Sequence, residues 1–366
     1  MNQAQKVVLV TTMVFLKALH VLFVHESTHH AGDEGSEGAQ YKYNTVMAVI
    51  LAEFIKLALS AGIFLRAYFR ESNGEVDPTA EFSAHKDWEG MTFSHGLSYA
   101  FPAMVYMIED NLRFIVMQHL RTPVTWMIFG HLEIPFVAIM SSVLLGRLFT
   151  RTQWISIVLL LSGVMSSQLA VCESRLHMPC SDISNYPVKG ILMVSVCALF
   201  AAFAGISSEF IYKRDLSTSI WLQNCLLYSY AIILNLLALG AKRLGDGSGM
   251  HLMTGFDTGM PWMVVLTMAG MGMTVSAVIK HMSSLAKVFT SAFCIFVTAF
   301  FSAMFEDFEL SLPFILAATE VVCALYLYML EQERKAAAAG KPGSPCDAEL
   351  ELLATTPKLN AMHGKP

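Results

Sequence analysis

Several long apolar stretches of this chain contain charged side chains, which are costly in hydrocarbon unless they face protein or water. Glu53 and Lys56 stand three residues apart in one stretch. On a helix such residues share a face and can form an ion pair. Two interpretations are open: the pair fixes the packing of helices, or it lines a path for a solute.

A denser polar group follows at Tyr106, Glu109, Asp110, Asn111 and Arg113. The last four can cover more than half of the circumference of a helix, so lipid cannot contact all of them. Asp and Asn also weaken helix continuity. The pattern predicts a broken or cavity-lining segment that forms a binding site, with a purely structural polar network as the alternative.

The next stretch contains His131, Glu133 and Pro135. An imidazole and a carboxylate two residues apart on a helix point to different faces, so each needs its own partner. A proline inside a membrane helix frees backbone groups and can form a hinge. The pattern indicates a flexible segment with two independent polar contacts.

In the second half of the chain, Glu209 and Lys213 have the spacing of a helical ion pair, and residues 217–219 can cap the helix that follows. Lys280 and Lys287 flank the link between two later stretches. Both are explained as basic residues at a membrane edge. Alternatively, Lys280 projects into a cavity, where a lysine suits a phosphate as a strong point charge.

Elements that cross a bilayer must position these residues. Only 14% of the 366 residues are charged, against about 25% in soluble domains, and the mean hydropathy is +0.52. We expect helices, because lipid offers no partners for backbone groups. The predicted fold is all-α and polytopic, with spans of roughly the ~20 residues that a bilayer requires. We place ten, at about 6–24, 43–69, 92–117, 122–145, 153–171, 188–212, 219–240, 261–280, 288–305 and 311–330.

Other classes of function find no support in the sequence. A net charge of −5 gives no basic surface for nucleic acid. Walker, GxGxxG, GxSxG and CxxC motifs are absent, so we expect neither an enzyme nor a cofactor. The histidines near residues 25–30 fit a solvated loop better than a metal site. Cys172 and Cys180 share a short loop and could pair in an oxidising lumen.

Basic residues at the span ends favour an N-terminus in the cytosol. That side would then hold twelve of them: Lys6, Arg66, Arg70, Lys86, Arg147, Arg151, Lys213, Arg214, Lys280, Lys287, Arg334 and Lys335. The other side would hold seven: Lys42, Arg113, Arg121, Arg175, Lys189, Lys242 and Arg243. Residues 1–330 are expected to form the membrane domain and residues 331–366 a disordered cytosolic tail.

The chain resembles the nucleotide-sugar transporter family that carries CMP-sialic acid, UDP-galactose and UDP-N-acetylglucosamine, within the drug/metabolite transporter superfamily. Glu53 and Lys56 are similar to its Glu-x-x-Lys, and residues 105–114 to its Val-Tyr and Asn-Asn-x-x-Phe elements. Residues 132–135 occupy the place of its Leu-Lys-Ile. Further motifs at 153–164, 203–224, 278–287 and 326–328 follow in the family's order.

The resemblance implies two inverted five-helix halves, about 1–171 and 188–330, around a central cavity. It also implies both termini in the cytosol and antiport of a CMP- or UDP-linked sugar into the Golgi, or the endoplasmic reticulum, against a nucleoside monophosphate. Whether the protein forms a homo-oligomer is left undecided. Together with the polar positions described above, the resemblance implies a substrate site of Glu53, Lys56, Tyr106, Asp110, Asn111, His131, Glu133, Ser207, Glu209, Lys213 and Lys280.

The chain departs from the family pattern within that site. Glu133 stands where the family has a lysine, and His131 stands for its glutamine. Asp110 replaces the first Asn of the pair, and Ser207 with Ser208 replaces an aromatic pair. A carboxylate facing a substrate phosphate would repel it. A transporter of the same fold for another solute, such as a metabolite or a weak base, is therefore the alternative.

Overall fold

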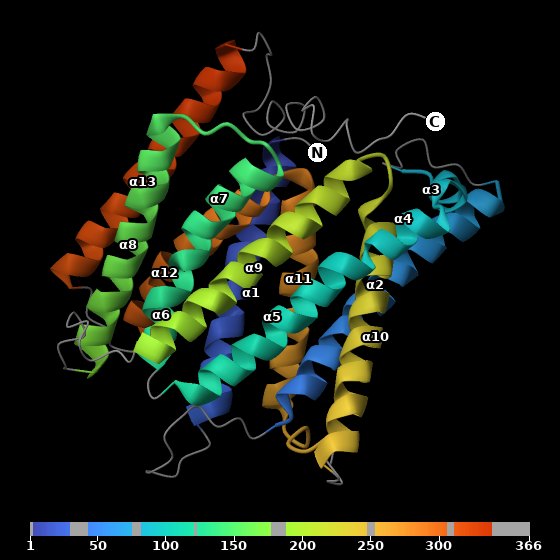
Figure 1. The fold of residues 1–366 in the computed structure, drawn as a ribbon, viewed down its shortest axis with the longest axis horizontal. Coiled ribbons are helices and arrows are strands. Elements are labelled where there is room, and N and C mark those ends of the chain that lie inside the picture. The colour runs from blue at the N-terminus through green and yellow to red at the C-terminus, as the bar shows by residue number, and fades with distance from the viewer. Residues whose placement is uncertain are drawn as a thin grey trace.

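The computed structural model describes residues 3–29, 43–74, 82–120, 123–176, 188–246, 253–305 and 311–338. Within these ranges the chain is helical and contains no strand, which confirms the all-α fold (Figure 1). The elements are α1 Gln3–His29, α2 Thr45–Ser72, α3 Ala84–Gly90, α4 Phe93–Ser98, α5 Ala100–His119, α6 Pro123–Phe129, the 3-10 turn η1 Gly130–Leu132, α7 Glu133–Leu144, α8 Arg151–Leu176, α9 Val188–Arg214, α10 Ile220–Asp246, α11 Gly259–His281, α12 Ser284–Phe305 and α13 Leu312–Ala338.

Seven helices in the described part of the chain are long and apolar enough to cross a membrane: α1, α2, α8, α9, α10, α11 and α13. This confirms a polytopic membrane protein, whereas the exact count of ten is not established. The predicted spans 122–145 and 288–305 overlap with shorter apolar helices, Gly130–Leu144 and Ser284–Val297. The predicted span 92–117 contains three charged residues within five positions of α5, Glu109, Asp110 and Arg113, which lowers its hydropathy.

Two of the predicted spans are interrupted. The segment 92–117 breaks at Tyr99, between α4 and α5, while α5 continues without interruption past Asn111. Of the two forms predicted for this segment, the broken one is therefore wrong at the polar residues. The segment 122–145 consists of α6, η1 and α7. Pro135 lies in the first turn of α7, where a missing N–H costs no helical hydrogen bond.

The helices of the bundle pack closely against their neighbours. α13 packs along α8, α2 contacts α10 and α11, α1 contacts α11 and α12, and α5 lies between α9 and α10. In Figure 1, α5 and α9 run side by side in front of α1 and α11. Gly163 lets α8 and α13 approach each other closely, because a Cβ there would lie 2.8 Å from Val321 Cγ2 and 3.2 Å from the Ala317 carbonyl.

Apolar side chains cover the outside of the bundle. Leu59, Ile155, Leu237, Leu266 and Leu316 belong to five different spans and are each at least half exposed. Water would make such a surface unfavourable, at about 25 cal/mol for each Å² of apolar area. Lipid removes that cost, so the surface fits a bilayer.

One end of the bundle gathers the links that the sequence places in the cytosol. The Lys335 ammonium of α13 bonds to the Leu148 carbonyl at 2.5 Å and to Gln153 at 2.7 Å, in and beside the α7–α8 link. The start of α1 and the end of α13 lie at this same end (Figure 1). The prediction of a tail from residue 331 is wrong for residues 331–338, which continue α13. Alanine, glutamate and lysine there are strong helix formers. Residues 339–366 lie outside the described residues.

Candidate functional site

The predicted pair of Glu53 and Lys56 is present in α2, with 2.5 Å between Lys56 Nζ and Glu53 Oε1. Both side chains are about nine-tenths buried. The Lys56 ammonium also lies 4.5 Å from the centre of the Tyr228 ring in α10. On the α11 side, a Cβ at Gly272 would lie only 2.8 Å from Lys56 Cδ. The pair therefore sits between three helices.

The polar residues of α5 face into the bundle. Phe101, Met104 and Ile115 are 41–47% exposed and mark the outer face of this helix. At 100° per residue, Asp110 and Arg113 project from the opposite face. Their side chains are nevertheless 29% and 46% exposed. These two charged side chains are therefore accessible on the face of α5 opposite to Phe101, Met104 and Ile115.

Ion pairs connect this face internally. The Arg113 guanidinium donates to Glu109, one helical turn away, and lies 3.9 Å from the Asp110 carboxylate. Asp110 also interacts electrostatically with Glu53 and Lys56 of α2. The charged groups of α2 and α5 therefore lie near enough to influence each other.

Glu133 extends the site to two further helices. Its carboxylate, at the start of α7, accepts a hydrogen bond of 2.7 Å from the Lys287 ammonium of α12. Lys17, near the middle of α1, and Arg113 also interact electrostatically with Glu133. The carboxylate that replaces the family lysine is thus paired.

We call these residues the central cluster. It collects side chains from α1, α2, α5, α7 and α12, and its four cations balance its four carboxylates to a formal charge of zero. Its members are Lys17, Lys56, Arg113 and Lys287 with Glu53, Glu109, Asp110 and Glu133.

Three other predicted site residues border the central cluster. Tyr106 and His131 both interact electrostatically with Glu133. Asn111 follows Asp110 on α5, but its amide donates to the Met107 carbonyl of its own helix at 2.7 Å. Tyr106 and His131 thus lie beside the central cluster, whereas the amide of Asn111 is used within α5.

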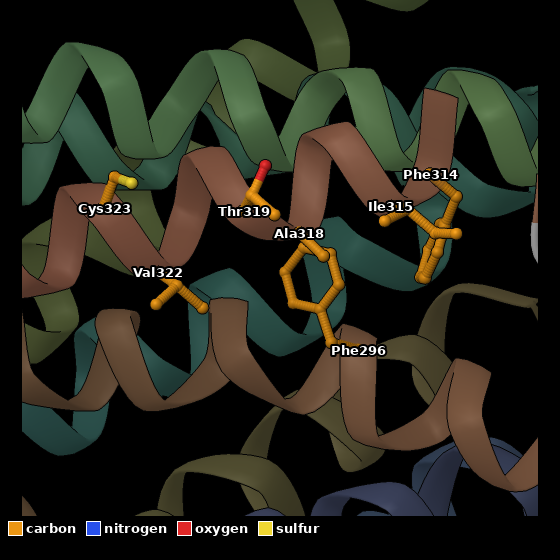
Figure 2. Close-up of a pocket in the computed structure, with 7 residues that line it drawn as sticks. All are labelled: Phe296, Phe314, Ile315, Ala318, Thr319, Val322 and Cys323. Carbon is orange, nitrogen blue, oxygen red and sulfur yellow. The ribbon is translucent and has the colours of Figure 1, made fainter. Parts of the chain in front are cut away.

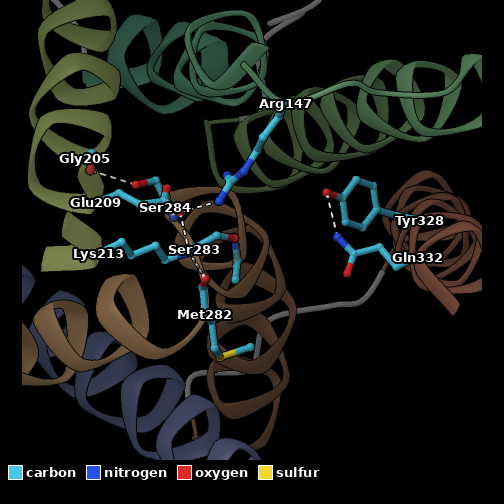
Figure 3. A network of polar contacts seen from close by, with 10 residues as sticks. Arg147, Gly205, Glu209, Lys213, Met282, Ser283, Ser284, Tyr328 and Gln332 are labelled. Atoms are coloured by element: carbon cyan, nitrogen blue, oxygen red, sulfur yellow. Dashed lines mark hydrogen bonds and ion pairs between the residues drawn. The ribbon is translucent and has the colours of Figure 1, made fainter. Parts of the chain in front are cut away.

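Glu209 and Lys213 belong to a separate buried network at one end of the bundle (Figure 3). The Glu209 carboxylate accepts from Arg147, from Lys213 at 2.7 Å and from the Ser284 amide at 2.8 Å. Lys213 also donates to the Met282 carbonyl at 2.5 Å. We call these contacts the terminal network. It joins α9 to the α7–α8 and α11–α12 links.

Ser207 lies two residues before Glu209 on α9, and its hydroxyl donates to the Ala204 carbonyl at 3.0 Å. The neighbouring Gly205 accepts a hydrogen bond of 2.7 Å from the Ser284 hydroxyl, which fastens α12 to this part of α9. The structure therefore brings Ser207 close to the terminal network.

Lys280 lies apart from the central cluster. Its buried ammonium donates to the Thr218 carbonyl and, at 2.7 Å, to the Gln223 side chain. Ser219 caps α10 as predicted, with its hydroxyl 3.4 Å from the Leu222 amide. In this conformation Lys280 holds the α9–α10 link, so an anion would have to displace both contacts.

The same link contains Asp215, outside the membrane-spanning helices. Burial favours its neutral acid, but hydrogen bonds donated by Thr218 and Ser217 outweigh this and hold the pKa of Asp215 below its usual value. The link between α9 and α10 is thus closed by an ionised carboxylate.

Sequence reasoning overlooked three residues of these two networks. Lys17 could have been identified from the sequence, because a lysine in the middle of a 21-residue apolar span needs a partner. Lys287 and Arg147 gave a weaker signal. Both stand at span ends, where the sequence explains them as membrane-edge residues, and their carboxylate partners are distant in the chain.

A groove of about 500 Å³ between α12 and α13 does not fit an anionic substrate (Figure 2). It contains no charged side chain and is lined by Phe296, Phe314, Ile315, Ala318, Thr319, Val322 and Cys323. The polar positions that can hold an anion lie in the central cluster instead.

The described residues contain no group of three His, Cys, Asp or Glu side chains that could hold a metal ion. The side chains of His25 and His29, and all of His30, lie outside the described part. Cys172 is disulfide-bonded. Cys180, its expected partner, lies outside the described residues as well.

Comparison with a solved crystal structure of another protein supports the fold. The two chains superpose with a TM-score of 0.59 at 11% identity, over 91% of this chain and 99% of the other. At this identity the likeness concerns the fold alone.

Curated relatives indicate the family. The chain is 29% identical to a CMP-sialic acid transporter of Arabidopsis thaliana, over 79% of this chain and 81% of that protein. It is 28% identical to the UDP-galactose translocator of Mus musculus, over 83% and 75%. A UDP-galactose/UDP-N-acetylglucosamine transporter of Caenorhabditis elegans is 30% identical, over 66% and 64%.

These relatives are transporters rather than enzymes, in agreement with the prediction from the sequence. The sequence profile described as nucleotide-sugar transporter matches residues 1–329, which include every membrane-capable helix except the last turns of α13. With charged side chains gathered inside a bundle of such helices, the chain belongs to the nucleotide-sugar transporter family.

Proposed function

We propose that this protein exchanges a CMP- or UDP-linked sugar for a nucleoside monophosphate across the Golgi membrane by alternating access. The convergence of the central cluster is the observation that carries the proposal. Its cations come from four helices, α1, α2, α5 and α12, and ionised groups at membrane depth are expensive unless they serve a path or a site. Arg and Lys are suited to the phosphates of such a substrate.

The terminal network concerns the conformational change that alternating access requires. It ties α9 to two links at one end of the bundle through side chains that are 0–6% exposed. We propose that this is the closed end, and that breaking the network opens the central cluster to that compartment. We further propose that residues 1–171 and 188–330 are the halves that rock against each other.

The orientation follows from the excess of basic residues at the end that holds the α7–α8, α9–α10 and α11–α12 links. We propose that this end faces the cytosol, together with both termini. Relatives named for CMP-sialic acid and for UDP-galactose leave the base and the sugar open.

A second candidate is a same-fold transporter of a solute with less negative charge, such as a metabolite or a weak base. The charge balance of the central cluster favours it, because four carboxylates offset four cations. Under this alternative, Glu133 would contact a cationic or hydrogen-bonding group of the solute.

Uptake into proteoliposomes separates the two candidates. Vesicles loaded with CMP, with UMP or with neither would receive labelled CMP-sialic acid, UDP-galactose and UDP-N-acetylglucosamine. The proposal expects uptake of at least one of them, accelerated by the matching monophosphate inside. Uptake of all three at the rate of protein-free vesicles would contradict it.

Nucleotide binding can also be measured directly by thermal unfolding. A ligand at 100 times its dissociation constant stabilises a protein by about 2.7 kcal/mol, which a thermal shift detects. A shift with CMP, UMP or UDP supports the nucleotide substrate. The weak-base candidate expects no shift with any of them.

A further inference from the structure

We propose that Glu133 is a built-in counter-ion, which occupies Lys287 in the empty transporter and must be displaced by a substrate phosphate. This inference rests on the proposed function, because it concerns how the same site selects its substrate. Glu133, which replaces the family lysine, then makes the site selective for phosphate-bearing substrates and does not prevent their binding.

The first step is that this ion pair is accessible. The side chains of Glu133 and Lys287 are 24% and 18% exposed, although their helices α7 and α12 pack together. By contrast, Glu209 in the terminal network is 0% exposed and receives three donors. Lys287 and Glu133 are therefore accessible to a ligand, whereas the Glu209 carboxylate is not.

The second step is that the displaced carboxylate would still have two other cations in its surroundings. Lys17 of α1 and Arg113 of α5 both interact electrostatically with Glu133. If a phosphate takes the Lys287 ammonium, Glu133 is not left as an isolated charge, which would be strongly unfavourable inside the bundle. An exchange of partners inside the central cluster is thus feasible.

The third step concerns charge. The central cluster sums to zero, so removal of the Glu133 charge would leave it at +1. The attraction gained by a ligand grows with the ligand's negative charge. A nucleoside diphosphate should gain more than a monophosphate, and an uncharged nucleoside should gain nothing.

The test is a binding series with the purified full-length protein, using uridine, UMP and UDP as probes in thermal-shift titrations. The variants are wild type, Glu133→Gln and the control Glu320→Gln. Glu320 is a carboxylate of the apolar helix α13 that accepts a hydrogen bond from Ser162 of α8 and does not belong to the central cluster. We expect Glu133→Gln to bind UDP about tenfold more tightly than wild type, to bind UMP more tightly by a smaller factor, and to bind uridine with unchanged affinity. Glu320→Gln should bind all three probes with the affinity of wild type.

Two results would overturn the inference alone. Weaker or unchanged UDP binding by Glu133→Gln, while wild type still binds UDP, would show that Glu133 does not compete with phosphate. An equal change for uridine and UDP would show that Glu133 contacts the nucleoside. Absence of binding by wild type to all three probes, with no uptake of any nucleotide sugar, would overturn the proposed function and the inference together.

A further variant covers the case in which Glu133→Gln does not fold. Glu133→Asp keeps the charge but shortens the side chain by one methylene, which weakens the contact with Lys287. It should also increase the affinity for UDP, by a smaller factor than Glu133→Gln does. Unchanged affinity in a folded Glu133→Asp protein would count against competition.

Discussion

The ammonium of Lys56 lies 4.5 Å above the ring of Tyr228 while it remains paired with Glu53. This contact joins α2 to α10 at the edge of the central cluster. The Tyr228 hydroxyl in turn lies 3.1 Å from the Ser276 hydroxyl of α11. One aromatic side chain therefore links three helices through two different interactions.

Substitutions at Tyr228 separate these interactions. Tyr228→Phe keeps the ring beneath Lys56 and loses only the hydroxyl contact, whereas Tyr228→Leu loses both. We expect the leucine variant to be less stable than the phenylalanine variant by about 0.5–2 kcal/mol, the range of a cation–π contact. Thermal unfolding of the two variants measures the difference. Equal stability would mean that the ring face contributes nothing to Lys56.

Gly272→Ala should disturb the central cluster without unfolding the bundle. A Cβ at this position would lie 2.8 Å from Lys56 Cδ and 3.1 Å from its Nζ, so the flexible lysine must move. We expect nucleotide-sugar uptake to fall at least tenfold. Gly62→Ala is the matched control, because nothing lies within 4 Å of its Cβ and alanine favours helix by about 0.5–1 kcal/mol. Normal uptake by Gly272→Ala would show that the position of Lys56 is unimportant.

Glu209→Ala should be strongly destabilising. It removes the acceptor of Arg147, Lys213 and the Ser284 amide, and leaves two buried cations without their carboxylate. Breaking such a pair costs about 3–5 kcal/mol. Glu331→Ala removes the partner of Arg334, which is 72% exposed, and should cost less than about 1 kcal/mol. Denaturation of the two variants under one condition gives the comparison, and similar losses would contradict the assignment.

Asp215→Asn should lower stability in a pH-dependent way. The folded pKa of Asp215 lies below its usual 3.8, because the hydrogen bonds from Thr218 and Ser217 outweigh the effect of burial. The ionised carboxylate therefore stabilises the fold above that pH, and this contribution disappears as the pH falls through the lower folded value. The melting temperatures of wild type and variant should differ at pH 7 and converge as the pH falls below 3.8. A constant difference would argue against the ionised form.

The sequence predicted the features that depend on local spacing. The pair of Glu53 and Lys56, the contact of Glu209 with Lys213 and the cap at Ser219 all follow from helical periodicity or turn chemistry. The helical fold followed equally from the length of the apolar stretches, since lipid permits few alternatives.

The partners that come from distant parts of the chain could not be predicted in this way. Glu133 pairs with Lys287, 154 residues later, and Glu209 pairs with Arg147, 62 residues earlier. Neither contact has a signature in local periodicity, because each depends on how whole helices pack. The same reason explains Lys280, which the sequence could place either at an edge or in a cavity.

The hydrogen bonds that Lys335 donates to Leu148 and Gln153 limit how far this protein can be shortened at its C-terminal end. A stop codon placed directly after residue 330, the end of the span expected from the sequence, would remove Gln332, whose amide donates to the Tyr328 hydroxyl, together with Lys335 itself. The safe boundary lies beyond Ala338, and affinity tags or fluorescent reporters should be attached there.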